Sequence, residues 1–243
     1  SGDKLAKVVS AGGWYFKINT TRAPLDDVNC RKSLAYALDY DSLVGTFQVT
    51  DDIAAGQKAR GPIPQGMIGY SENVPLVEYN LDKARDYLSK CKYSGDDLKV
   101  TINWIAEVPF EESWALILQQ GAMAIGYDAT VETLPWAVFT EQVTKPETTP
   151  NLSIVAVQAQ TPDPDGLIYN MYHSAAAGTW QSTEWLQDDK IDAMLNSGRT
   201  TIDGNERVAI YDEIKAPTLE NSSKYGFSTM AQNFSFRLME VPN

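Results

Sequence analysis

The side chains that could catalyse a reaction are few in this sequence, and they are scattered along it. The single histidine, His173, has no serine or cysteine partner in a recognisable nucleophile motif, and no Gly-x-Ser-x-Gly occurs. A P-loop and a dinucleotide-binding fingerprint are also missing. One histidine and two distant cysteines do not match the ligand spacing of a zinc site. We therefore expect no enzyme activity, no metal and no cofactor, and we expect His173 at the surface or rim.

Two acidic pairs need an explanation. Asp163 and Asp165 stand two residues apart in a proline-rich turn, where they could bind calcium, face a ligand or serve a hydrolase. Aspartates in turns commonly bond their own backbone, and the spacing of an EF-hand is absent, so we favour turn and helix capping. Glu111 and Glu112 lie at an expected helix start, where the helix dipole favours negative charge. We assign them no function.

The candidate ligand-binding residues are amides and aromatics near strand ends. Gln158 and Gln160 precede Asp163 in a segment that follows an expected strand, and Trp104 and Trp136 stand at the ends of two others. Amides can satisfy the hydroxyl groups of a ligand, and aromatic faces can stack on the C–H surfaces of a sugar. These five residues form the predicted site. Core packing remains an alternative for the two tryptophans, because tryptophan is highly buried on average.

Composition narrows the range of partners. The 243 residues suit one large domain or one and a half, and 43% hydrophobic with 21% charged residues is ordinary for a globular protein. The formal net charge of −12 argues against nucleic acid and against an anionic membrane surface, which both attract lysine and arginine clusters. No apolar run approaches the roughly 20 residues needed to span a bilayer.

Strand and helix patterns alternate along the chain. Strands are expected over 8–19, 98–104, 129–134 and 152–157, a loop over 51–69, an extended segment over 225–236, and a helix end or kink at Pro217. Helices are expected over 26–38, 39–44, 80–91, 114–125, 135–143, 188–195 and 203–214. This alternation predicts an α/β lobe around a mostly parallel sheet. The segments at 104, 135–136 and 158–163 then converge beyond the carboxyl ends of the strands, where such sheets bind ligands.

The segment Pro24–Val44 (PLDDVNCRKSLAYALDYDSLV) predicts two short helices joined by a turn. It resembles a signature of the extracytoplasmic solute-binding proteins of family 5, the oligopeptide, dipeptide and nickel receptors of ABC importers. That signature has a Pro-Phe-Asp-Asp-Val lead, an Arg-Gln-Ala-Leu core and a Tyr-Ala-Ile-Asp-Arg ending. Further matches follow in the family's order: GWYFKIN at 13–19, GPIPQGMIGY at 61–70, YNLDKARDYLSKC at 79–91, Gly126, Pro162-Asp163-Pro164, and Glu206-Arg207 with Tyr211.

The resemblance implies a periplasmic-binding-protein type II lobe with a mixed, mostly parallel sheet flanked by helices. It implies a monomeric substrate-binding component of an ABC importer, periplasmic or at the cell surface. Such a component captures a small solute, by family a peptide, and delivers it to a membrane permease. A sugar or oligosaccharide receptor is the alternative. The chain would then be a fragment of three parts. Residues 1–22 would form a strand lead-in from a missing amino-terminal lobe, residues 23–230 the carboxy-terminal ligand-binding lobe, and residues 231–243 a return segment toward the missing lobe.

Two features depart from the family pattern. In its peptide receptors an acidic residue just before Pro-Asp-Pro often holds the α-ammonium of the ligand, and the matching position here is Gln160. A neutral amide cannot supply the ion pair that offsets the desolvation of a buried ammonium. Cys30 and Cys91 occupy positions that the family usually fills with small apolar residues. We favour buried free thiols over a disulfide, although the compartment would permit one.

Overall fold

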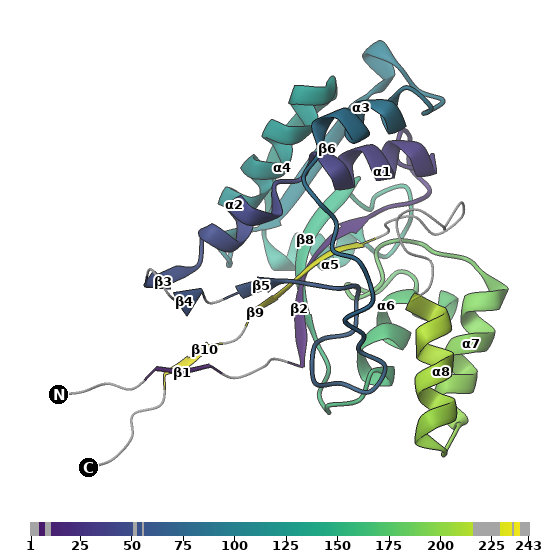
Figure 1. Cartoon of the computed structure of the whole chain (residues 1–243). Helices are drawn as coiled ribbons and strands as arrows, with labels where there is room; N and C mark the ends of the chain where they lie inside the picture. The colour runs from purple at the N-terminus through teal and green to yellow at the C-terminus, as the bar shows by residue number, and fades with distance from the viewer. Residues whose placement is uncertain are drawn as a thin grey trace.

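The computed structural model describes residues 5–7, 11–50, 53–54, 56–215, 229–234 and 236–238. A six-stranded sheet forms its centre, with the order β5-β9-β2-β8-β6-β7 (Figure 1). Along the sheet these strands are β5 (Gly56–Lys58), β9 (Thr229–Phe234), β2 (Gly12–Ile18), β8 (Leu152–Gln158), β6 (Lys99–Ile105) and β7 (Asp128–Leu134). The loop expected over 51–69 therefore contains a short edge strand, β5.

The sheet is mixed, as predicted. β6 pairs in parallel with both β7 and β8. β2 runs antiparallel to β8 and β9, and β5 runs antiparallel to β9. The three strands expected over 98–104, 129–134 and 152–157 thus form the parallel part of the sheet. Their carboxyl ends lie at one edge, which is the geometry that binds ligands in open α/β sheets.

Two small sheets lie beside the central one. β1 (Leu5–Lys7) pairs antiparallel with β10 (Phe236–Leu238), and β3 (Gln48–Thr50) pairs with β4 (Ile53–Ala54). The β1–β10 pairing brings the two ends of the described chain side by side (Figure 1). The division into a lead-in, a lobe and a return segment stays a prediction. Pro217 and part of the extended stretch 225–236 lie outside the described residues.

Four helices gather around β6 and β8 in Figure 1: α1 (Val28–Ala37), α2 (Tyr40–Gly45), α3 (Leu81–Leu88) and α4 (Glu111–Ile125). They share one hydrophobic cluster with the sheet, in which Ile102, Ile154 and Trp114 are fully buried. α4 crosses α1 closely at Gly121, because a Cβ there would lie 1.9 Å from the carbonyl oxygen of Ala37. Gly126, with φ of 113°, ends α4 as predicted.

The second cluster packs the opposite side with α5 (Trp136–Gln142), a π-helical turn over Asp165–Tyr169, α6 (Asn170–Tyr172), α7 (Asp189–Thr200) and α8 (Gly204–Lys215). Tyr15, Phe139 and Tyr211 are its largest fully buried side chains. Predicted helix starts are confirmed by side chains that accept backbone N–H groups: Asp27 for α1, Asp39 for α2, Asn80 for α3, Asp188 for α7 and Asp203 for α8.

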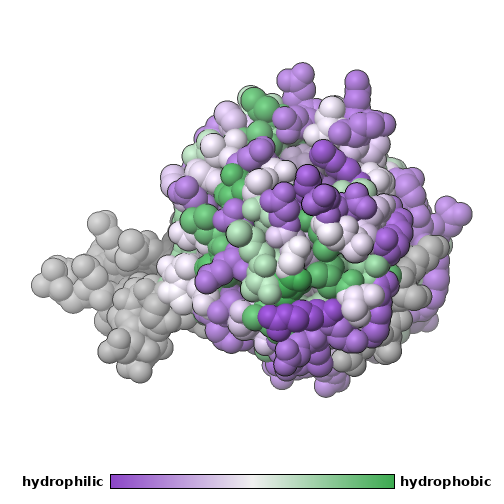
Figure 2. Space-filling model, turned by 90° about the horizontal axis from the view of Figure 1, so that it is seen from above, coloured by the Kyte–Doolittle hydropathy of each residue, from purple (hydrophilic) through white to green (hydrophobic). Residues whose placement is uncertain are grey.

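The described surface carries few large apolar side chains. Leu116 and Met123 on α4 are 48% and 58% exposed, and Ile202 between α7 and α8 is 98% exposed. Figure 2 shows that on the face seen from above, hydrophobic residues are interspersed with hydrophilic ones. None of the helices in the described ranges is long and apolar enough to cross a membrane.

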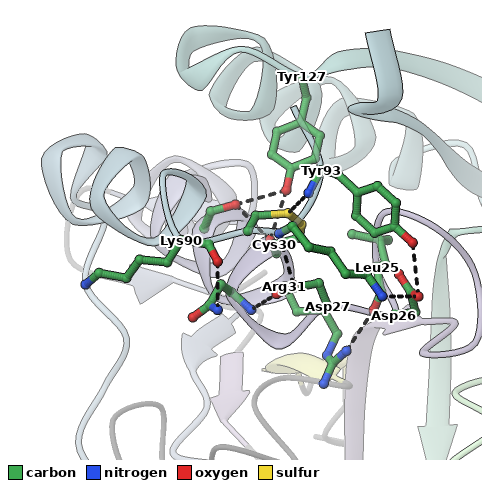
Figure 3. Close-up of a disulfide and its surroundings, with 12 residues drawn as sticks. Leu25, Asp26, Asp27, Cys30, Arg31, Lys90, Tyr93 and Tyr127 are labelled. Carbon is green, nitrogen blue, oxygen red and sulfur yellow. Dashed lines mark hydrogen bonds and ion pairs between the residues drawn. A yellow bond between two sulfur atoms is a disulfide. The ribbon is translucent and has the colours of Figure 1, made fainter. Parts of the chain in front are cut away.

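The prediction of free thiols was wrong, because Cys30 and Cys91 form a disulfide with a Cα–Cα distance of 5.2 Å (Figure 3). The bond joins α1 to the residues that follow α3. Tyr93 donates its N–H to the sulfur of Cys91, and the Tyr127 hydroxyl donates to the carbonyl of Cys30. Helix periodicity showed that both cysteines lie on apolar faces, but it could not show that the packing of α1 against α3 brings those faces together.

Candidate ligand-binding site

The loops that follow β6, β7 and β8 are held at one edge of the sheet by backbone hydrogen bonds. Ala106, directly after β6, donates its N–H to the carbonyl of Leu134 at the end of β7, with an N···O distance of 2.9 Å. Ala159, directly after β8, donates to Ala11, directly before β2, also at 2.9 Å. Together with the parallel pairing of β6 with β7 and with β8, these bonds place the three loops along the same edge of the sheet.

The two glutamines lie on the solvent side of this edge. Gln158 and Gln160 are exposed, whereas Val157 and Ala159, which alternate with them, are buried. The alternation follows from the extended backbone, which points successive side chains to opposite sides. Both amides are therefore positioned to meet a solute at the edge, and their contact with a ligand stays a prediction.

The two candidate tryptophans pack against different clusters. Trp104 is partly buried and packs against the first cluster, the one beneath α1 and α4. Trp136 is 37% exposed, and its ring contacts Phe139 and Trp180, with centroid distances of 5.7 Å and 5.4 Å. The ring of Trp180 meets the ring of Trp136 edge to face, with an interplanar angle of 66°. Of the two candidates, Trp136 is the more exposed residue.

Glu107 lies in the same group of loops, and sequence reasoning did not single it out. It follows β6 by two residues and is exposed. Both of its carboxylate oxygens accept the backbone N–H of Trp136, at 2.9 Å and 3.2 Å. The carboxylate therefore caps the start of α5 and stands beside the residue that carries the exposed ring. The only sequence signal was an acid placed directly after a strand.

Asp163 is held by an arginine. Its two carboxylate oxygens accept from the two terminal nitrogens of Arg207, each at 2.8 Å, and one of them also accepts the N–H of Asp165 at 2.9 Å. The last contact confirms the predicted turn-capping role. Hydrogen bonding from Arg207 holds the pKa of Asp163 below its ordinary value, against the opposing effect of burial. Asp163 thus joins the loop after β8 to α8.

Asp165 is held in the same way. Arg199 on α7 donates to both carboxylate oxygens of Asp165 at distances of 3.0 to 3.2 Å, and its guanidinium lies 3.5 Å from the centroid of the Tyr169 ring. Two arginines from two helices therefore fix the Pro-Asp-Pro turn. Because each carboxylate is engaged by a guanidinium, the pair lacks the arrangement of a general acid and base.

A buried ion pair and a buried histidine lie in this half of the molecule. Lys17 on β2 and Glu184 form an ion pair at 2.7 Å, and both side chains are fully buried. Burial lowers the pKa of Lys17, and Glu184 opposes that shift. His173, expected at the surface or rim, is buried: its ring stacks on Tyr169 at 4.3 Å and accepts the N–H of Ala175. Its surroundings arise from the packing of α6 on α7, which the sequence pattern did not reveal.

Glu111 lies at the same edge, on the side of α4. Its side chain accepts the N–H of Ile105, the last residue of β6, at 3.0 Å and the indole N–H of Trp14 at 3.1 Å. Burial raises the pKa of Glu111 to about 8, and the two hydrogen bonds offset part of that rise. The helix dipole alone therefore does not account for this residue, which also fastens the end of β6 to β2.

Comparison with known proteins identifies the family. The profile described as bacterial extracellular solute-binding proteins, family 5 Middle, matches residues 2–179. The chain belongs to family 5 of the bacterial extracellular solute-binding proteins. A family-5 relative, the probable D,D-dipeptide-binding periplasmic protein DdpA of Escherichia coli, is 22% identical over 86% of this chain and 39% of its own length. The dipeptide-binding protein of the same organism is 26% identical over 82% of this chain and 37% of its own length.

The family's fold is also shown by a solved structure. HbpA2 of Haemophilus parasuis, at 23% identity, superposes with a TM-score of 0.83 over 96% of this chain and 44% of that one. The fold is that of a type II periplasmic binding protein, as the sequence predicted. The chain spans less than half the length of the family-5 relatives and of the solved structure that it matches. The matched motifs of family 5 predicted this family, whereas the arginine contacts of the Pro-Asp-Pro turn became visible only in three dimensions.

Proposed function

We propose that this chain is the ligand-binding lobe of a substrate-binding protein that captures a small solute and delivers it to an ABC permease. The observation that carries the proposal is the convergence of the loops after β6, β7 and β8 at one edge, in a chain that belongs to family 5. The peptide class is supported by relatives whose printed names are dipeptide-binding proteins. The role is binding without catalysis.

The disulfide supports a location outside the cytoplasm. Disulfides form and persist in oxidising compartments such as the periplasm or the cell surface, and they are rare in the cytosol. We therefore propose a periplasmic or cell-surface protein that acts as a monomer until it meets its permease.

Gln160 favours a second candidate, a sugar or oligosaccharide receptor. Gln158 and Gln160 present neutral amides, and Trp136 presents an exposed ring, at the edge where the ligand would lie. On either reading, we propose that no ligand α-ammonium is held by residue 160. Gln160→Asp should then leave the affinity for the native ligand unimproved or weaker.

A three-part binding measurement tests the proposal. Isothermal titration with free-amine dipeptides, N-acetylated dipeptides and oligosaccharides should give binding for one class. The affinity should be weak for this chain alone, because a second lobe would supply the other contacts. If no solute in the three sets gives a binding isotherm or a thermal shift with this chain, the proposed function is contradicted. Turnover of any of these solutes would overturn the non-catalytic role.

A further inference from the structure

The acidic side chains at the ligand edge are not equivalent. Asp163 and Asp165 each face an arginine that engages both carboxylate oxygens, so their charge is neutralised within the protein. Glu107 is different, because within the described part of the chain its carboxylate accepts one backbone N–H, that of Trp136. A carboxylate has about four acceptor positions. Glu107 is exposed, and it retains both its charge and the capacity to accept further donors.

The residue whose backbone N–H binds Glu107 belongs to an aromatic pair. Trp136, which donates this N–H, is 37% exposed as a residue, and its ring meets the ring of Trp180 edge to face. A cation placed over a tryptophan face is attracted by the negative charge density of the ring. An exposed carboxylate alone holds a cation weakly, because water screens the pair. A ring beside it adds attraction and removes part of that water.

We infer that Glu107, Trp136 and Trp180 form a subsite for a cationic group, an ammonium or a guanidinium, on the bound solute. This deepens the proposed function and rests on it, because the subsite lies at the edge where that solute would bind. It transfers the recognition of positive charge from the loop after β8, where residue 160 is neutral, to the loops after β6 and β7. The chain's net charge of −12 also favours the approach of a cation.

The test uses a small cation with a matched neutral molecule. Tetramethylammonium chloride and tert-butanol have similar size and shape but differ in charge, and sodium chloride controls for ionic strength. Binding of the probe is measured through the indole N–H signals of Trp136 and Trp180 in two-dimensional nitrogen–proton spectra of the 15N-labelled chain. Trp136→Phe and Trp180→Phe assign these signals. We expect both to shift progressively with tetramethylammonium and to stay in place with tert-butanol.

Two matched variants separate the subsite from general electrostatics. Glu107→Gln removes the charge but keeps an oxygen that can accept the N–H of Trp136, so the start of α5 is preserved. Glu141→Gln removes one charge from an exposed position on α5, the helix whose start Glu107 caps. We expect Glu107→Gln to weaken tetramethylammonium binding about fivefold or more and Glu141→Gln to leave it unchanged.

The outcomes distinguish the subsite from the proposed function. Equal shifts with tert-butanol, no shifts with either probe, or equal effects of the two variants would overturn the cation subsite. A peptide or sugar that binds Glu107→Gln as tightly as the unmodified chain, while tetramethylammonium fails, would leave solute binding intact and remove the subsite. Binding of tetramethylammonium that depends on Glu107, with no solute bound in any class, would support the subsite and contradict the proposed function.

Discussion

Removing the Cys30–Cys91 disulfide should destabilise the protein substantially. The bond closes a loop with a sequence separation of 61 residues. In the chain-entropy description, a loop of this length restricts the unfolded state by about 4 kcal/mol at room temperature. We therefore expect Cys30→Ala/Cys91→Ala to lower the free energy of unfolding by about 4 kcal/mol. The urea m-value should rise, because the open unfolded chain exposes more surface.

Urea denaturation followed by tryptophan fluorescence measures this effect, with and without dithiothreitol. Reductant should lower the midpoint of the unmodified protein towards that of the double variant, and it should leave the double variant unchanged. The double variant is the matched control, because it has no sulfur pair to reduce. A midpoint that dithiothreitol does not move, together with two thiols per chain titrating in urea without reductant, would refute the disulfide.

Three further predictions concern buried and paired charges. Arg207→Ala should lower the free energy of unfolding by about 1–2 kcal/mol, because Asp163 loses its bidentate partner at the surface; an unchanged urea midpoint would contradict this. Lys17→Met should lower the free energy of unfolding by about 3–5 kcal/mol, because Glu184 would remain charged and buried. The double variant Lys17→Met/Glu184→Met should recover part of this loss, and a double variant no more stable than the single one would argue against the pair. Folding raises the pKa of Glu111 from 4.5 to about 8, so the stability that its protonated form contributes is present below pH 4.5 and is lost as the pH rises to about 8. The free energy of unfolding should therefore fall between about pH 5 and 8, and it should fall less steeply in Glu111→Gln. Equal slopes in the two proteins would contradict the shift.

The sequence predicted the parts of this molecule that depend on local signals. The strands that became β6, β7 and β8 follow from alternating or continuous apolar runs, and the helix starts follow from Asp27, Asp188 and other capping residues. The edge at which their loops converge follows from parallel pairing alone. The order of the motifs along the chain predicted the family.

What sequence reasoning missed depends on contacts between distant segments. Cys30 lies on α1 and Cys91 just after α3, and no local pattern determines how these two helices are placed relative to one another. Arg207 stands 44 residues from Asp163, so their pairing was invisible. Glu107 was overlooked because an acid after a strand is common, and only its contact with Trp136 makes it informative.

The central claim is that a solute binds at the carboxyl edge of β6, β7 and β8, and mapping the bound solute on the chain tests it most directly. Backbone amide spectra of the 15N-labelled chain, recorded during titration with whichever solute gives binding by isothermal titration, locate the contact. We expect the largest progressive shifts in the backbone amides of residues 106–108, Trp136, 158–161 and Asp163. Shifts confined to α3, α4 or the surface of α8, with these three loops unchanged, would contradict the claim.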